Sequence, residues 1–249
     1  MKLWEHEEFE RLQYYAAKEK KSDAAILIFP GGAYAFLADH EGRGYAEYLN
    51  SIGYDAFVCL YRVAPARFPG ALLDARRAVR VIKKHARELG IDPDKIVVMG
   101  SSAGGNLAAL LCTCSDALPG EEEDDLRDLP YLPDGQVLCY PVISLALDET
   151  THKDSRKNLL GDDLRLAMAL SPERNVNGKT PEAFLWHTAD DPAVSVRNTL
   201  IYAEALCAAG VPAEVHIFPH GYHGMGLAKD DPSVGAWTGL LEAWLKNNF

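Results

Sequence analysis

Apolar and polar positions along the chain follow two alternating patterns. Short apolar runs bounded by polar or glycine-rich residues indicate buried strands. The longer segments between them carry apolar residues at every third or fourth position, which is the spacing of one face of a helix. The predicted strands are residues 24–29, 54–61, 95–100, 136–140, 183–187 and 213–218, and the predicted helices are residues 72–89, 104–114, 196–209 and 234–246.

This alternation indicates an α/β fold, in which helices cover both faces of a largely parallel sheet. In the segment 72–89, Ala75, Val79 and Ile82 share one helical face, and Gly90 then ends the helix. Gly53 and Gly210 also lie between a helix-like run and the next strand, as expected for residues that end helices. No internal repeat or linker is visible, so the sequence favours a single domain over residues 1–249.

Two segments interrupt the alternation. Residues 121–128 read Glu-Glu-Glu-Asp-Asp-Leu-Arg-Asp and contain six acidic side chains. We expect a solvated loop there rather than a cation site, because like charges repel and stay hydrated. The stretch 141–181 is longer than an ordinary connection between strands. It is expected to form a small lid or a wall of a substrate site.

Composition and charge exclude several classes of function. The 249 residues include 25 Lys and Arg against 36 Asp and Glu, which gives a net charge of −11. No Lys/Arg cluster outweighs the acidic residues around it, so nucleic acid and anionic membranes are not expected as partners. No apolar stretch approaches the ~18 residues of a membrane span.

The start of the chain and the cysteines bear on the compartment. The start lacks the pattern of a secretory signal, and the five cysteines are an odd number, so they cannot all pair within the chain. We expect reduced thiols and a cytoplasmic location.

The clearest chemical motif is Gly100-Ser101-Ser102-Ala103-Gly104. It follows a predicted strand and precedes a predicted helix, which is the setting of a nucleophile on a sharp strand-to-helix turn. Small neighbours on both sides allow the tight turn, and the helix N-terminus lies beside the hydroxyl. The alternative is a glycine-rich turn in which the serine only caps the helix. We interpret Ser102 as a candidate nucleophile.

A serine hydroxyl needs a base, and the base needs an orienting carboxylate. Asp191 follows the predicted strand 183–187, and His223 lies in a glycine-rich loop after the predicted strand 213–218. The order Ser, Asp, His, each after a strand, is that of the α/β-hydrolase fold. Asp190 and His220 lie close to these residues and are the competing assignments. His223, flanked by Tyr222 and Gly224, is preferred to His220.

Acyl transfer also requires hydrogen-bond donors for a developing oxyanion. The small residues after the strand 24–29 offer backbone N–H groups at Gly32 and Ala33, and the third candidate is the N–H of Ala103. Gly31 and Tyr34 of the same loop are the candidate substrate-binding residues. Tyr34 either stacks on a sugar or acyl group or packs beneath the loop. Glu41 and Arg62 are expected to pair and brace this loop.

With these residues identified, the chain resembles a compact α/β-hydrolase of the carboxylesterase type, close to small bacterial acetyl xylan or sugar esterases. The resemblance runs from about residue 24 to the C-terminus. It rests on the motifs that contain residues 30–34, 40–42, 61–65, 74–78, 100–107, 191–194 and 223–224. It implies a mostly parallel sheet with a small insert after the sixth strand, and through Pro192 and Val194 it favours Asp191 over Asp190. Ala33 stands where many relatives have a third glycine, which is expected to narrow the acyl pocket.

The resemblance implies hydrolysis of short acyl esters, often acetyl groups on plant-polysaccharide sugars, through an acyl-enzyme and without a metal or organic cofactor. The expected partner is therefore a small-molecule or oligosaccharide ester; a homodimer stays open. Three other functions compete with this hypothesis. They are a serine peptidase or amidase on the same fold, a lipase for long acyl chains, and a non-catalytic small-molecule receptor.

Overall fold

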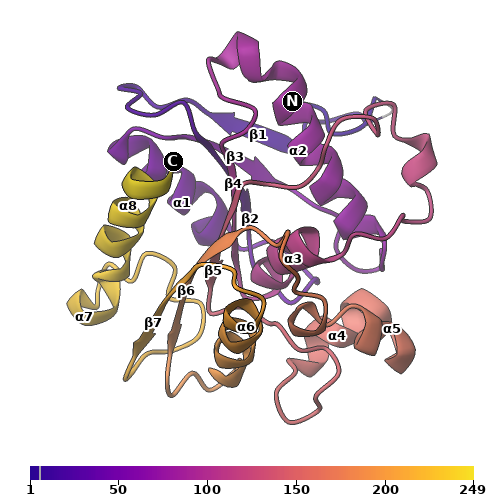
Figure 1. Cartoon of the computed structure of the whole chain (residues 1–249), viewed down its shortest axis with the longest axis vertical. Helices are drawn as coiled ribbons and strands as arrows, with labels where there is room; N and C mark the ends of the chain where they lie inside the picture. Colours follow the sequence, from indigo (N-terminus) through magenta and orange to yellow (C-terminus); the bar gives the residue numbers. More distant parts are fainter. Residues whose placement is uncertain (6) are drawn as a thin grey trace.

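A computed structural model describes residues 1–5 and 7–249. Its centre is a seven-stranded sheet in the order β1-β3-β2-β4-β5-β6-β7, in which β1 is antiparallel to β3 and all other neighbours are parallel (Figure 1). The strands are β1 (Leu12–Tyr15), β2 (Ala25–Phe29), β3 (Asp55–Cys59), β4 (Ile96–Ser101), β5 (Gly135–Cys139), β6 (Glu182–Thr188) and β7 (Ala213–Phe218). The predicted α/β class is confirmed.

Helices form a layer on each face of the sheet, with α1 and α8 on one side and α2, α3 and α6 on the other (Figure 1). The helices are α1 (Asp39–Ile52), α2 (Gly70–Leu89), α3 (Ala103–Thr113), α4 (Lys153–Leu160), α5 (Leu164–Ala169), α6 (Arg197–Ala208), α7 (Pro232–Gly235) and α8 (Trp237–Asn248), with 3-10 turns at Glu121–Glu123 and Pro172–Arg174. Two apolar cores fill the spaces between the sheet and these layers. Within residues 1–5 and 7–249, no helix combines the length and apolarity needed to cross a bilayer.

All six predicted strands are present, and the sheet contains one more. β1 has only four residues and lies at the edge of the sheet, so its apolar signal is short. Helix α1 was not predicted, because its first two turns contain Gly42 and Gly44, residues that weaken a helical pattern. The predicted helix 234–246 is divided, because α7 ends at Gly235 and α8 begins at Trp237.

The long insert follows β5, the fifth strand of the chain, and not a sixth strand as expected. The reason is that only one strand, β1, precedes β2 in this sheet. The insert contains α4 and α5 and is anchored to its surroundings. Leu159 and Leu160 are buried in the core, and the carbonyl oxygen of Leu159 accepts a hydrogen bond from the N–H of Phe68 at 2.8 Å. These contacts make α4 a packed wall of the molecule.

The acidic run is solvated only in part: Glu122, Glu123, Asp125 and Asp128 are exposed, as the charge pattern predicted, but Glu121 and Asp124 are not. Asp124 is only 2% exposed and binds two buried arginines of α2, Arg77 and Arg80. Glu121 bonds with Arg80 at 2.8 Å and with Arg76, which is also buried. The positive charges lie more than forty residues earlier in the chain, so the local sequence contains no sign of them. Through Glu121 and Asp124, the acidic run holds the loop that follows α3 against helix α2.

Replacing Asp124 with Ala is expected to lower the free energy of unfolding by about 3–5 kcal/mol, because two buried guanidinium groups lose their shared carboxylate. Urea unfolding measures this loss. Asp125→Ala is the matched control, since Asp125 also contacts Arg77, at 2.6 Å, but its side chain is 53% exposed. Its loss should stay below about 1 kcal/mol. Equal losses in the two variants would contradict the role of the buried pair.

Candidate active site

Ser102 occupies a strained turn between β4 and α3. Its backbone angles are φ 52° and ψ −117°, a conformation that is unfavourable for a residue with a side chain. The turn depends on two glycines: a methyl group at Gly100 would collide with the carbonyl of Gly104, and one at Gly104 would collide with the carbonyl of Phe29. The N–H of Ser102 donates to the carbonyl oxygen of Cys139 at 3.0 Å. Neighbouring strands thus hold the hydroxyl above the carboxyl end of β4.

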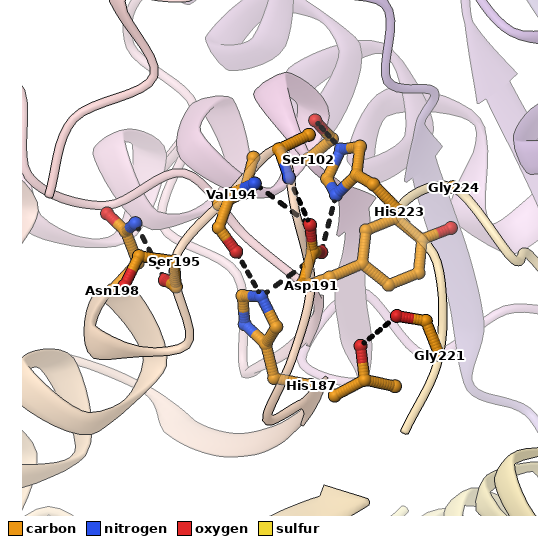
Figure 2. A network of polar contacts seen from close by, with 12 residues as sticks. Ser102, His187, Asp191, Val194, Ser195, Asn198, Gly221, His223 and Gly224 are labelled. Carbon is orange, nitrogen blue, oxygen red and sulfur yellow. Dashed lines mark hydrogen bonds and ion pairs between the residues drawn. The ribbon is translucent and has the colours of Figure 1, made fainter. Parts of the chain in front are cut away.

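The structure brings Ser102, His223 and Asp191 together in one chain of hydrogen bonds (Figure 2). The hydroxyl oxygen of Ser102 lies 2.8 Å from Nε2 of His223, and Nδ1 of His223 lies 2.7 Å from Oδ2 of Asp191. Because a carboxylate only accepts, Nδ1 carries the proton and Nε2 is left to accept from the serine. This is the arrangement that activates a serine nucleophile.

Asp191 is held as an anion. Burial of its side chain acts to raise its pKa, but hydrogen bonds from His187, His223 and the N–H of Val194 outweigh burial. The pKa of Asp191 consequently lies well below the usual range of a carboxyl group. Its Oδ1 accepts from the N–H groups of Ala193 and Val194 at 2.8 and 2.9 Å. The charge that orients His223 is therefore fixed by the turn after β6.

His187 is a second histidine beside Asp191, and its role there was not predicted from the sequence. It is fully buried, with Nε2 2.9 Å from the carbonyl oxygen of Val194 and 3.4 Å from Oδ2 of Asp191 (Figure 2). A carbonyl only accepts, so Nε2 carries the proton, and Nδ1 accepts from the hydroxyl of Thr199 at 2.8 Å. Its position four residues before Asp191 is the only signal that the sequence contains.

The competing residues form a pair of their own. Nδ1 of His220 lies 2.8 Å from Oδ2 of Asp190, and the other oxygen of Asp190 accepts from the N–H of Gly221. Both side chains are exposed, at 84% and 53%. They hold the loop before His223, and they do not contact Ser102 among the interactions of the described chain. Adjacent residues thus serve different histidines because their side chains diverge.

The loop after β2 passes close to Ser102 and leaves two amides available. Gly32 and Ala33 have φ values of 132° and 54°, so the chain turns through a region that favours glycine. Within the described chain, the backbone hydrogen bonds of this loop use the N–H groups of Ala35, Phe36 and Ala38 and not those of Gly32 or Ala33. Ala103 is the first residue of α3, where N–H groups have no partner within the helix.

The insert supports this loop from the side. Nδ2 of Asn158 in α4 donates a hydrogen bond to the carbonyl oxygen of Ala33 at 2.9 Å. This hydrogen bond fixes the orientation of the peptide group between Ala33 and Tyr34. The insert therefore borders the loop that carries the candidate oxyanion donors.

Tyr34 does not present its ring to a substrate. The side chain is 1% exposed, its hydroxyl donates to Oδ1 of Asn106 at 2.8 Å, and its ring lies edge-on to Tyr61. The ring is packed beneath the loop, where the backbone of Tyr34 has a positive φ of 57°. The prediction that Tyr34 presents its ring to a substrate is wrong, and the alternative, packing beneath the loop, is confirmed.

The expected pair of Glu41 and Arg62 is also wrong. Arg62 binds Asp74 at 2.9 Å, whereas Glu41 is buried and accepts a hydrogen bond from the N–H of Gly31 at 2.8 Å. Gly31 therefore has no free N–H to offer a substrate, which corrects its assignment as a substrate-binding residue. A methyl group at Gly31 would lie 3.1 Å from Cβ of Ser102, so this glycine instead allows the loop to approach the serine.

No group of three or more His, Cys, Asp or Glu side chains in the described part of the chain is arranged to hold a metal ion. The five cysteines are free thiols, and three of them, Cys59, Cys112 and Cys139, are buried.

Comparison with known proteins identifies the family. A model of the BD-FAE family matches residues 12–206, a span that contains Ser102 and Asp191. The chain belongs to the BD-FAE family. Among solved structures, the acetyl ester-xyloside bifunctional hydrolase from Caldicellulosiruptor lactoaceticus is 44% identical to this BD-FAE chain, with a TM-score of 0.91. The alignment covers 98% of this chain and 94% of that one. The expected α/β-hydrolase fold is confirmed.

Two curated relatives are longer than the BD-FAE chain. Endo-1,4-beta-xylanase B of Butyrivibrio fibrisolvens is 35% identical over 221 residues, covering 86% of this chain and 34% of that protein. The acetylxylan esterase of Xylanibacter ruminicola is 32% identical over 218 residues, covering 84% of this chain and 42% of that protein. The chain thus spans less than half the length of either relative.

His187→Phe is expected to destabilise the protein and slow the reaction of Ser102 with a fluorophosphonate. The variant leaves buried groups on Val194 and Thr199 without a partner, at a cost of about 1–3 kcal/mol each. Displacement of Asp191 should reduce the labelling rate by about 3- to 30-fold. Urea unfolding and timed labelling measure the two effects. His216→Phe, on the partly exposed strand β7, is the control. An unchanged labelling rate in His187→Phe would contradict the support of Asp191 by His187.

The low pKa of Asp191 predicts how stability depends on pH. The unfolded chain binds the proton more readily than the native state, so ionised Asp191 stabilises the protein above about pH 4, and this contribution is lost as the pH falls further. The stability advantage of wild type over Asp191→Asn should therefore grow as the pH rises from about 2 to 5. Urea unfolding across this range measures it. Asp190→Asn, at an exposed ion pair, should show a smaller change; equal changes would oppose this account.

Proposed function

We propose that this chain is a serine ester hydrolase that cleaves short acyl esters, above all acetyl esters, through an acyl-enzyme. The observation that carries the proposal is the hydrogen-bonded chain from Ser102 through His223 to Asp191, next to two free amides of the oxyanion loop. Family membership agrees with this chemistry, since relatives and solved neighbours include esterases.

The proposed reaction begins at Ser102. Nε2 of His223 removes the hydroxyl proton while Oγ attacks the ester carbonyl, and Asp191 stabilises the imidazolium that forms. The oxyanion accepts hydrogen bonds from the N–H groups of Gly32, Ala33 and Ala103. His223 then gives its proton to the leaving alcohol, and the acyl group stays on Ser102. Water, deprotonated by His223, attacks the acyl-enzyme and releases the acid.

The proposed substrate is an acetyl ester of a xylan-derived sugar. The acetylxylan esterase of Xylanibacter ruminicola and the acetyl ester-xyloside hydrolase from Caldicellulosiruptor lactoaceticus support this class of substrate. We also propose a short acyl group, because Ala33 stands where many relatives have a third glycine and is expected to narrow the acyl pocket; Asn158 holds the carbonyl oxygen of Ala33 at 2.9 Å. Residues 1–249 are proposed to act as a single domain, with the insert 141–181 as a wall of the site rather than a separate lid. The cytoplasmic location stays a prediction.

Ser102→Ala is expected to lower the turnover of both p-nitrophenyl acetate and acetylated xylo-oligosaccharides by at least about 10⁴-fold, because no nucleophile remains. Acetate release measures turnover on the oligosaccharide. Ser115→Ala is the control, since Ser115 is an exposed serine beyond the far end of α3. Retention of most activity in a folded Ser102→Ala protein would disprove the assignment of Ser102 as the nucleophile.

Cleavage of peptides or amides in preference to esters would support the peptidase alternative. A wild-type protein that neither hydrolyses esters nor reacts with a fluorophosphonate would support a receptor.

A further inference from the structure

Glu41, on the first turn of α1, is a buried carboxylate outside the Ser–His–Asp chain. It is 3% exposed, and both of its oxygens are used. Oε2 accepts the N–H of Gly31 at 2.8 Å, and Oε1 accepts the hydroxyl proton of Tyr140 at 2.6 Å. In the described chain the only basic side chain that pairs with it is His40, at 3.8 Å, and that side chain is 59% exposed. A buried carboxylate without a lysine or arginine contributes poorly to stability, which points to another role.

Tyr140 connects Glu41 to the loop that carries His223. It lies immediately after β5 at φ 37°, and its ring meets the imidazole of His223 edge-on, with centroids 5.1 Å apart. Burial raises the pKa of Tyr140 well above its ordinary value, so the hydroxyl keeps its proton and donates it to Glu41. The same oxygen accepts the N–H of Gly226, three residues after His223, at 3.0 Å.

A second contact joins the start of α1 to the same loop. Nε2 of His40 lies 2.9 Å from the carbonyl oxygen of Gly224, which accepts its proton. Oε1 of Glu41 lies 4.0 Å from the point where a side chain on Gly224 would begin. Glu41 is therefore packed between Gly31, in the loop of the oxyanion donors, and Gly224, next to His223.

We propose that Glu41 is a positioning residue for the ester hydrolysis, and that it sets the spacing between the oxyanion loop and the histidine loop. The proposal rests on the proposed function. The oxyanion donors and the base act on the same tetrahedral centre, so an error in their separation weakens both proton transfer and oxyanion binding. One carboxylate that bonds to Gly31 and, through Tyr140, to Gly226 holds the two loops at a constant separation.

The two hydrogen bonds, to Gly31 and to Tyr140, carry this role rather than the charge. Alanine at position 41 would leave the N–H of Gly31 and the hydroxyl of Tyr140 without a partner, and a gap between the loops. Glutamine keeps the size. Its oxygen can accept from Gly31, and its amide can donate to Tyr140, whose own proton can turn toward the hydroxyl of Tyr45, 3.1 Å away.

The test compares Glu41→Ala, Glu41→Gln and the control Glu47→Ala. Glu47 lies on the same helix, but its side chain is 57% exposed and pairs only with Arg43 among the described contacts. With p-nitrophenyl acetate, kcat of Glu41→Ala should fall about 10- to 100-fold while KM changes by less than about 3-fold. Glu41→Gln should keep kcat within about 5-fold of wild type, and Glu47→Ala should match wild type. Fluorophosphonate titration of Ser102 counts the folded sites.

The outcomes separate this proposal from the proposed function. Activity in wild type and its loss in Ser102→Ala support ester hydrolysis whatever happens at position 41. A wild-type kcat in Glu41→Ala, or equal losses in Glu41→Ala and Glu41→Gln, would overturn the positioning role alone. If Glu41→Ala does not fold, Tyr140→Phe provides the answer, because it removes one hydroxyl and leaves the ring. Its kcat should fall about 5- to 20-fold, and an unchanged kcat would overturn the proposal.

Discussion

The arrangement of the site depends on one tight contact, the packing of α3 against the end of β2 and β4. Gly104 lies against the carbonyl of Phe29, and Gly100 lies against the carbonyl of Gly104, with no space for a side chain at either position. This closeness allows the chain to turn from strand to helix within one residue, and it holds Ser102 in a backbone conformation that it would not adopt alone. The unfavourable conformation is maintained by the surrounding sheet and by backbone bonds to Cys139 and Val142.

The parallel strands then decide where everything else meets. Since β2, β4, β5, β6 and β7 run in the same direction, the loops at their carboxyl ends converge on one edge of the sheet. Each loop contributes one kind of group to that edge: amides after β2, the hydroxyl after β4, Tyr140 after β5, a carboxylate after β6 and an imidazole after β7. Cross-contacts such as His187 to Asp191 and Glu41 to Tyr140 join these loops into one unit.

Much of the fold could be predicted because its signals are local. Buried strands and amphipathic helices repeat at their own periods, and the glycines of the turn at Ser102 lie next to the residue that needs them. The elements that were missed have weak local signals: β1 is four residues long, and α1 contains two glycines near its start. The anchoring of the acidic run was missed for a different reason, because Arg77 and Arg80, which neutralise Asp124, lie on another element.

The sequence by itself determined the fold class, the sharp turn at Ser102 and the presence of an acid and a histidine after later strands. Only the tertiary structure decided which side chains are partners: Asp191 rather than Asp190 for His223, Gly31 and Tyr140 rather than Arg62 for Glu41, and Asn106 rather than a substrate for Tyr34. The physical reason is that backbone conformation follows from neighbouring residues. A buried hydrogen bond, in contrast, joins residues that are far apart in the chain and meet only when the sheet has formed.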